Sequence, residues 1–165
     1  MTSALTMHAN VATIQPVAQE DITGCGIACV ASLAGVRYRE VKARASRLGV
    51  EVTDSRLWSD PTVVRTLLKQ YGIRANPKEL PFRSWEALPP LALLAIKWHR
   101  KGNQASWHWI IFWQSPTGPV VLDPKKTLKH PIRTDWGRMK PKWFIAITLQ
   151  RSGQRERSRQ ERNGP

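Results

Sequence analysis

The order of two hydrophobic patterns is the feature that most constrains the fold of this chain. Up to Gly72, apolar residues recur at helical spacing, and beyond it they occur in short continuous runs separated by turn residues. These runs are LALLAIKWH, HWIIFW, PVVLDP and WFIAITLQ. Successive runs joined by short turns are typical of an antiparallel sheet. Helices followed by such a sheet predict an α+β fold in which N-terminal helices pack on the sheet.

Three helices are expected before the sheet. The first begins near Thr23–Cys25, with Thr23 as a candidate N-cap, and stops at Gly35. The second covers REVKARASRLGV, and its apolar face is formed by Val41, Ala45 and Leu48. The third begins at Ser59 or Asp60, and its apolar stripe is formed by Val63, Val64, Leu67 and Leu68.

The length of 165 residues suits one domain, which we expect to span residues 16–150. Residues 1–15 are expected to form a flexible arm, and residues 151–165, which contain no apolar side chain, a disordered basic tail. The N-terminus lacks the features of a signal peptide, and the most apolar run is too short to span a membrane. We therefore expect a cytoplasmic protein without a membrane span.

Cysteine content and charge limit the classes of function further. The two cysteines are four residues apart, which is poor geometry for a disulfide within one helix. The four histidines do not pair at usual zinc-ligand spacings, so we expect no metal and no cofactor. The net charge of +14 would attract nucleic acid, anionic lipid or an acidic protein. A basic surface without a dedicated partner explains the charge equally well.

Cys25 is the candidate nucleophile. It stands between two glycines where the first helix is expected to begin, and a helix N-terminus favours the thiolate form of a cysteine. Cys29, one turn later among small apolar residues, has the setting of a buried packing residue. A buried, inert Cys25 is the alternative interpretation, because such cysteines are common.

Three further residues could complete a thiol-dependent site. His108 opens the apolar run HWIIFW and could act as the base, and Asp123 ends the next run and could orient the imidazole. Gln19 lies six residues before Cys25 and could donate to an oxyanion together with a backbone N–H. Each residue also has an ordinary structural explanation: a hydrogen-bonded histidine, an Asp-Pro turn and a solvated glutamine.

The order of these residues resembles a known family. The segment from Gln19 to Cys29, QEDITGCGIAC, is similar to the opening of the double-glycine leader peptidases, the papain-like cysteine peptidase domains of bacteriocin-processing ABC transporters. His108 followed by an apolar strand, and Asp123 followed by Pro124, fit the same pattern. The resemblance implies a papain-like fold, with Cys25 as nucleophile, His108 as base, Asp123 as orienting residue and Gln19 as oxyanion donor.

The same resemblance implies a substrate and leaves alternatives open. It implies hydrolysis of a peptide or protein after small, Gly-Gly-like residues, here by a stand-alone peptidase because the chain carries no transporter. A papain-like site also supports deamidation or isopeptide cleavage. A papain-like binding module whose basic surface engages nucleic acid or an acidic protein is the alternative from another class. The tryptophans beside the histidine, Trp107, Trp109 and Trp113, are predicted to share the strand face opposite His108.

Overall fold

The computed structural model describes residues 13–149. Most of the predicted arm and all of the predicted tail therefore lie outside the described residues. Three helices form the first half: α1 (Cys25–Ala34), α2 (Tyr38–Arg47) and α3 (Pro61–Gln70), with a short 3-10 turn, η1 (Ser55–Trp58), before α3. The strands follow: β1 (Arg74–Ala75), β2 (Leu80–Pro81), β3 (Leu91–Lys101), β4 (Gln104–Ser115), β5 (Gly118–Leu122), β6 (Ile132–Arg133) and β7 (Trp143–Thr148), with a 3-10 turn, η2 (Trp136–Arg138), before β7.

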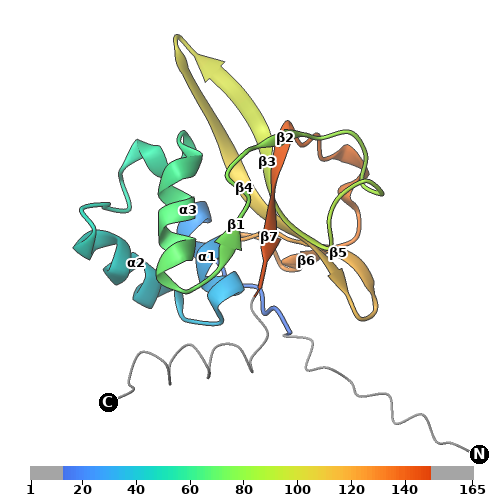
Figure 1. Cartoon of the computed structure of the whole chain (residues 1–165), viewed down its shortest axis with the longest axis horizontal. Helices are drawn as coiled ribbons and strands as arrows, with labels where there is room; N and C mark the ends of the chain where they lie inside the picture. The colour runs from blue at the N-terminus through green and yellow to red at the C-terminus, as the bar shows by residue number, and fades with distance from the viewer. Residues whose placement is uncertain (1–12, 150–165) are drawn as a thin grey trace, which may run out of the picture.

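The strands form one seven-stranded sheet in which all the pairings are antiparallel. Its order is β1-β7-β3-β4-β5-β6, and β2 also pairs with β7. The three helices lie together on one side of this sheet, as Figure 1 shows. The predicted α+β fold, with N-terminal helices packed on an antiparallel sheet, is therefore confirmed. No helix among residues 13–149 has the length and apolar content needed to cross a membrane.

The helix boundaries agree with the sequence pattern except at two positions. Gly35 ends α1 in the left-handed conformation, with a φ of 67°, and Asp60 caps α3 by accepting from the amide of Thr62. Thr23 does not cap α1. Its hydroxyl donates to the carbonyl of Val52 instead, and Gly24 occupies the N-cap position. Leu48 was also expected on the buried face of α2, but it follows the helix and is 43% exposed.

The segment RKGNQAS, expected to be a loop, is mostly strand. β3 and β4 continue as a hairpin as far as Lys101 and Gln104, so that only a two-residue turn separates them. This hairpin projects from the sheet in Figure 1. The sequence gives no signal for this extension because most of its residues are polar and exposed, whereas the apolar pattern marks only the buried part of each strand. His108 accordingly lies within β4 and not at its start.

Both faces of the sheet are covered, which explains why its central strands are continuously apolar. On the helix side, Trp109 and Ile111 of β4 pack against α1 and α3 in the larger core cluster. On the other side, Ile110 and Phe112 pack under the chain segments around Trp85 and Trp136. Alternate residues of one strand thus enter two separate cores.

The helices and the sheet approach each other closely at Gly26, in the first turn of α1. A β-carbon there would lie 3.2 Å from the carbonyl oxygen of Leu57, 3.2 Å from Val64 and 3.3 Å from the indole of Trp109. The indole nitrogen of Trp109 donates to that same Leu57 carbonyl at 2.8 Å. Glycine at position 26 therefore lets the helix start rest directly on the sheet.

Gly26→Ala is predicted to lower the free energy of unfolding by about 1–3 kcal/mol, because the added methyl must push apart a packed core. Urea denaturation monitored by tryptophan fluorescence would measure the loss. Gly137→Ala is the matched control, since a β-carbon at Gly137 meets nothing within 4 Å. Equal stability of the Gly26 variant and the wild type would contradict the tight contact.

Candidate active site

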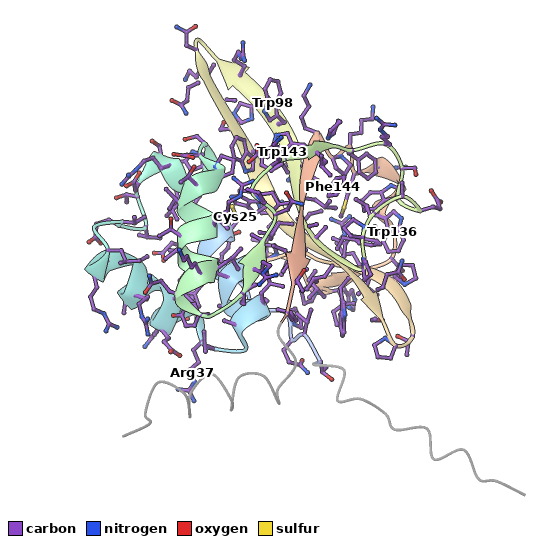
Figure 2. The ribbon with its side chains drawn as sticks, in the orientation of Figure 1. Cys25, Arg37, Trp98, Trp136, Trp143 and Phe144 are labelled. Atoms are coloured by element: carbon purple, nitrogen blue, oxygen red, sulfur yellow. The ribbon has the colours of Figure 1, made fainter. Side chains whose placement is uncertain are left out.

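Cys25 is the first residue of α1 and is 5% exposed. The amides of a helix's first turn have no partner within the helix, so the sulfur lies beside unpaired N–H donors that favour negative charge. Figure 2 shows Cys25 between the helical layer and the sheet. The thiol is therefore at the boundary of the two layers, where a group from the sheet can reach it.

The turn before Cys25 is held by a partly buried hydrogen-bond system. The Tyr38 hydroxyl donates to Asp21 at 2.7 Å, and the Lys42 ammonium lies 3.0 Å from the same carboxylate oxygen. These two partners lower the pKa of Asp21. The carbonyl of Asp21 in turn accepts from the amide of Gly24, whose α-carbon packs so closely on the Tyr38 ring that no side chain fits there. The turn that presents Cys25 is thus fixed by α2.

His108 comes from β4 and lies opposite Ile96 of β3. Its neighbours Trp107 and Trp109 point to the helix side, where they form edge-to-face contacts with each other and with Trp143. Trp113 packs against the same helix-side cluster, so the shared face predicted for the three tryptophans is confirmed. Packing of large aromatic rings on both sides of His108 along the strand keeps the backbone that carries the imidazole rigid.

The imidazole is held by Asp123. His108 Nε2 and Asp123 Oδ1 are 2.9 Å apart, and the carboxylate is 4% exposed. Asp123 follows the last residue of β5 and accepts two further bonds, from the amide of Lys125 and from Nη1 of Arg133. The carboxylate is therefore fixed from three directions. Because Nε2 is engaged by Asp123, Nδ1 is the ring nitrogen left for the thiol.

The ionisation of His108 reflects both of its neighbours. Burial by itself lowers the pKa of His108, but hydrogen bonds with Asp123 and with the Cys25 thiol raise it, and the net effect is a rise to about 9. Burial alone would raise the pKa of Asp123, whereas the interactions with His108, Lys125 and Arg133 lower it below 3.8. At neutral pH the pair is an imidazolium on a carboxylate, next to the sulfur.

Gln19 lies in the same region, but its amide is engaged elsewhere. Its backbone N–H donates to the carbonyl of Pro124 at 2.8 Å, which joins the approach to α1 with the turn after Asp123. Its side-chain Nε2 donates to the carbonyls of Asp21 and Ile22, at 3.0 and 2.8 Å. Both side-chain N–H bonds are therefore used within the turn, while Oε1 is buried without a partner. The role of oxyanion donor stays a prediction.

A cleft of about 400 Å³ gives access to this site. Gln19, Ile22 and His108 line it together with Lys97 of β3 and the turn after Asp123. Ile22 is the one large aliphatic side chain of the lining and is 97% exposed. The cleft thus exposes the imidazole to solvent and to a ligand.

The other candidate residues fall outside the site. Cys29 is 1% exposed within the helix-side core, and its burial raises its thiol pKa well above the usual value. His99 and His130 are exposed, and His99 bonds to the carbonyl of Lys97 and the hydroxyl of Ser106. No group of three or more His, Cys, Asp or Glu side chains suited to a metal ion occurs in the described part of the chain.

Sequence reasoning missed the residues that support the site. Three basic or hydroxyl side chains bind carboxylates of other elements: Tyr38 and Lys42 bind Asp21, and Arg133 binds Asp123. None of the three is near its partner along the chain. A tyrosine near the start of a helix, or an arginine in a two-residue strand, carries no local signal for such a role. Only the tertiary packing brings these groups to Asp21 and Asp123.

Comparison with known proteins finds several solved structures that are similar to this chain. The chain is similar to the peptidase domain of Streptococcus ComA, a bi-functional ABC transporter involved in a quorum-sensing pathway. The identity is 14% and the TM-score 0.43, over 84% of this chain and 100% of that chain. No protein-family model and no curated protein matches the sequence. A similarity at this level carries no chemistry to this chain.

The charged pair gives the folding stability a defined pH dependence. Because the pKa of His108 is raised from 6.5 to about 9, its contribution is complete below pH 6.5 and is lost as the pH rises through 9. Because the pKa of Asp123 is lowered, its contribution is present above pH 3.8 and is lost as the pH falls through the lowered value.

His108→Gln is therefore predicted to remove the alkaline part of this dependence. Urea denaturation at several pH values should show that the wild type loses stability between pH 6.5 and 9, and that the variant loses markedly less. His130→Gln, an exposed loop histidine, is the control and should behave as the wild type. Parallel curves for the His108 variant and the wild type would exclude a protonated His108 in the folded protein.

Proposed function

We propose that this chain is a cysteine peptidase in which Cys25 is the nucleophile and His108 its acid-base partner, oriented by Asp123. The observation that carries the proposal is the position of the imidazole. It is bonded to a buried carboxylate, it lies near enough to the thiol at the start of α1 for the thiol to raise the pKa of the imidazole, and it lines an open cleft. A histidine with a purely structural role requires none of these three features, so their combination indicates a functional role.

The first half of the reaction is acylation. The Cys25 sulfur, with its proton held on His108 Nδ1, attacks the carbonyl carbon of the scissile peptide bond. The carbonyl oxygen becomes negative and is stabilised by backbone N–H groups of the first turn of α1. The C–N bond then breaks, the imidazolium gives its proton to the leaving amine, and a thioester on Cys25 remains.

The second half is hydrolysis of the thioester. A water molecule loses one proton to the neutral His108 and its oxygen attacks the thioester carbonyl. The C–S bond breaks, the carboxylic acid leaves, and the proton on His108 is again shared with the sulfur. Asp123 stays ionised throughout and keeps the ring in the orientation that both steps require.

The proposed substrate is a peptide with small, Gly-Gly-like residues before the cut. This specificity comes from the resemblance of the Gln19–Cys29 segment. Short side chains before the cut let the peptide backbone lie close to the thiol.

The decisive experiment follows cleavage of synthetic peptides by mass spectrometry. Wild-type chain is expected to cut after Gly-Gly and Gly-Ala and not after bulky residues, and Cys25→Ser is expected to abolish the cut while leaving the fold intact.

Iodoacetamide should label Cys25 much faster than the buried Cys29. Cys29→Ser is the matched control, and should retain activity but lose about 1–3 kcal/mol of stability through a buried hydroxyl.

The same assay separates other chemistry of an activated thiol. Deamidation would convert a glutamine to an acid without cutting the chain, and isopeptide cleavage would release a side-chain-linked segment. Both require rapid labelling of Cys25, so labelling without backbone cleavage would favour them. Labelling no faster than that of free cysteine would contradict every function that needs a reactive thiol at this site.

Gln19 provides a separate prediction about the oxyanion. If its amide turns toward the substrate during acylation, Gln19→Ala should lower kcat about 100-fold or more while leaving the rate of Cys25 alkylation unchanged. If the amide only supports the turn, as its bonds to Asp21 and Ile22 suggest, the variant should lose stability and alter alkylation as well. Measuring kcat, alkylation rate and urea stability on one preparation distinguishes the two roles.

A further inference from the structure

A second and larger cavity adjoins the cleft and is strongly basic. Its volume is about 660 Å³, and Asp123 forms part of its wall. We call it the basic groove, after the five basic side chains that line it: Lys97, Arg133, Arg138, Lys140 and Lys142. Lys97 lines both the groove and the cleft, so the two spaces are neighbours on either side of the His108–Asp123 pair.

The positive charge of the basic groove is not neutralised by carboxylates of the described residues. Its one acidic residue, Asp123, is already bonded to His108 and Arg133. Within the described residues, no carboxylate lies within ion-pair distance of the other four cations of the groove. Cations gathered in a concave surface reinforce one another and raise the local potential for an anionic ligand.

Lys97 is placed at this junction by an irregularity of the strand. Between Ile96 and His99 the pairing of β3 with β4 shifts by one residue, which is a β-bulge directly beside the cross-strand partner of His108. Lys97 has a φ of 52°, the one non-glycine residue with a positive φ among residues 13–149. A lysine in the left-handed region is strained, and such strain is maintained where a side chain must be aimed.

The wall of the groove also holds Trp98, with cations on its ring. Lys142 Nζ lies 4.8 Å and Arg100 Cζ 5.8 Å from the ring centroid. Figure 2 shows this tryptophan where the β3–β4 hairpin leaves the sheet. Cation–π contacts hold the two basic groups near the groove, and they also cover the aromatic face that a stacked nucleobase would need.

We propose that the substrate is an acidic peptide, whose Asp or Glu side chains bind in the basic groove while its small residues lie at Cys25. This inference rests on the proposed peptidase function and names its substrate class. The groove and the cleft share Lys97, which favours a single extended chain that occupies both. Carboxylates bind lysine and arginine through charge-assisted hydrogen bonds, so acidic residues near the cut supply affinity that glycines cannot.

The test compares peptides that share a Gly-Gly cut and differ in flanking charge. Glutamate blocks are placed on the N-terminal side in one series and on the C-terminal side in another, with glutamine blocks of equal length as neutral partners. Binding is measured by fluorescence anisotropy on the full-length Cys25→Ser variant, and turnover on the wild type. In one series we expect glutamate to improve both affinity and kcat/KM about tenfold over glutamine, with the gain falling as salt rises.

Two variants locate the effect. Arg138→Gln combined with Lys140→Gln should reduce the glutamate-to-glutamine ratio of kcat/KM toward one, and Lys97→Asn should do the same with a residue that tolerates the left-handed conformation. Arg37→Gln combined with Lys69→Gln removes the same charge from exposed positions at the start of α2 and the end of α3, and should leave the ratio unchanged.

The outcomes separate this inference from the function on which it rests. Cleavage of neutral peptides without any preference for glutamate overturns the acidic substrate and leaves the peptidase standing. Tight, groove-dependent binding of the glutamate peptide without cleavage or rapid labelling of Cys25 supports the groove and overturns the peptidase. A single-stranded oligonucleotide of equal charge that binds more tightly than the peptide, with the groove variants abolishing that binding, also overturns the proposal.

Discussion

The contact between the start of α1 and the face of β4 is the constraint on which the site depends. Gly26 rests against Trp109 and the carbonyl of Leu57, and this close approach sets where the helix begins relative to the sheet. Cys25 is one residue before that contact, and His108 is one residue before Trp109. Because each reactive residue adjoins a member of the contact, packing in the core fixes the distance between thiol and imidazole.

Electrostatics then give the packed site its chemical character. A buried carboxylate without partners would pick up a proton, but Asp123 is bonded to His108, Arg133 and the amide of Lys125. The stabilised carboxylate favours the imidazolium, so a positive charge is held beside the start of α1. Arg133 forms ion pairs with both Asp123 and Asp135, and so connects the site to the segment that borders the basic groove.

The sequence predicted the helices, the main strands and the four candidate residues, because each has a local signal. Gly35, Asp60 and the apolar stripes mark the helices, and the apolar runs mark the buried strand segments. The contributions of Tyr38, Lys42 and Arg133 could not be predicted, since they arise only when distant elements meet. The bulge at Lys97 was equally hidden, because nothing in the run AIKWH distinguishes a regular strand from an irregular one.

The burial of Cys29 also determines how the chain would respond to oxidation of Cys25. Cys25 and Cys29 are the only cysteines in the sequence, and Cys29 is enclosed by the core with its thiol kept protonated. A sulfenic acid formed on Cys25 would need a second thiolate to trap it as a disulfide, and the chain has none to offer. Rescue of the oxidised sulfur would then depend on a small external reductant able to enter the cleft, and without one the damage would proceed to irreversible acids.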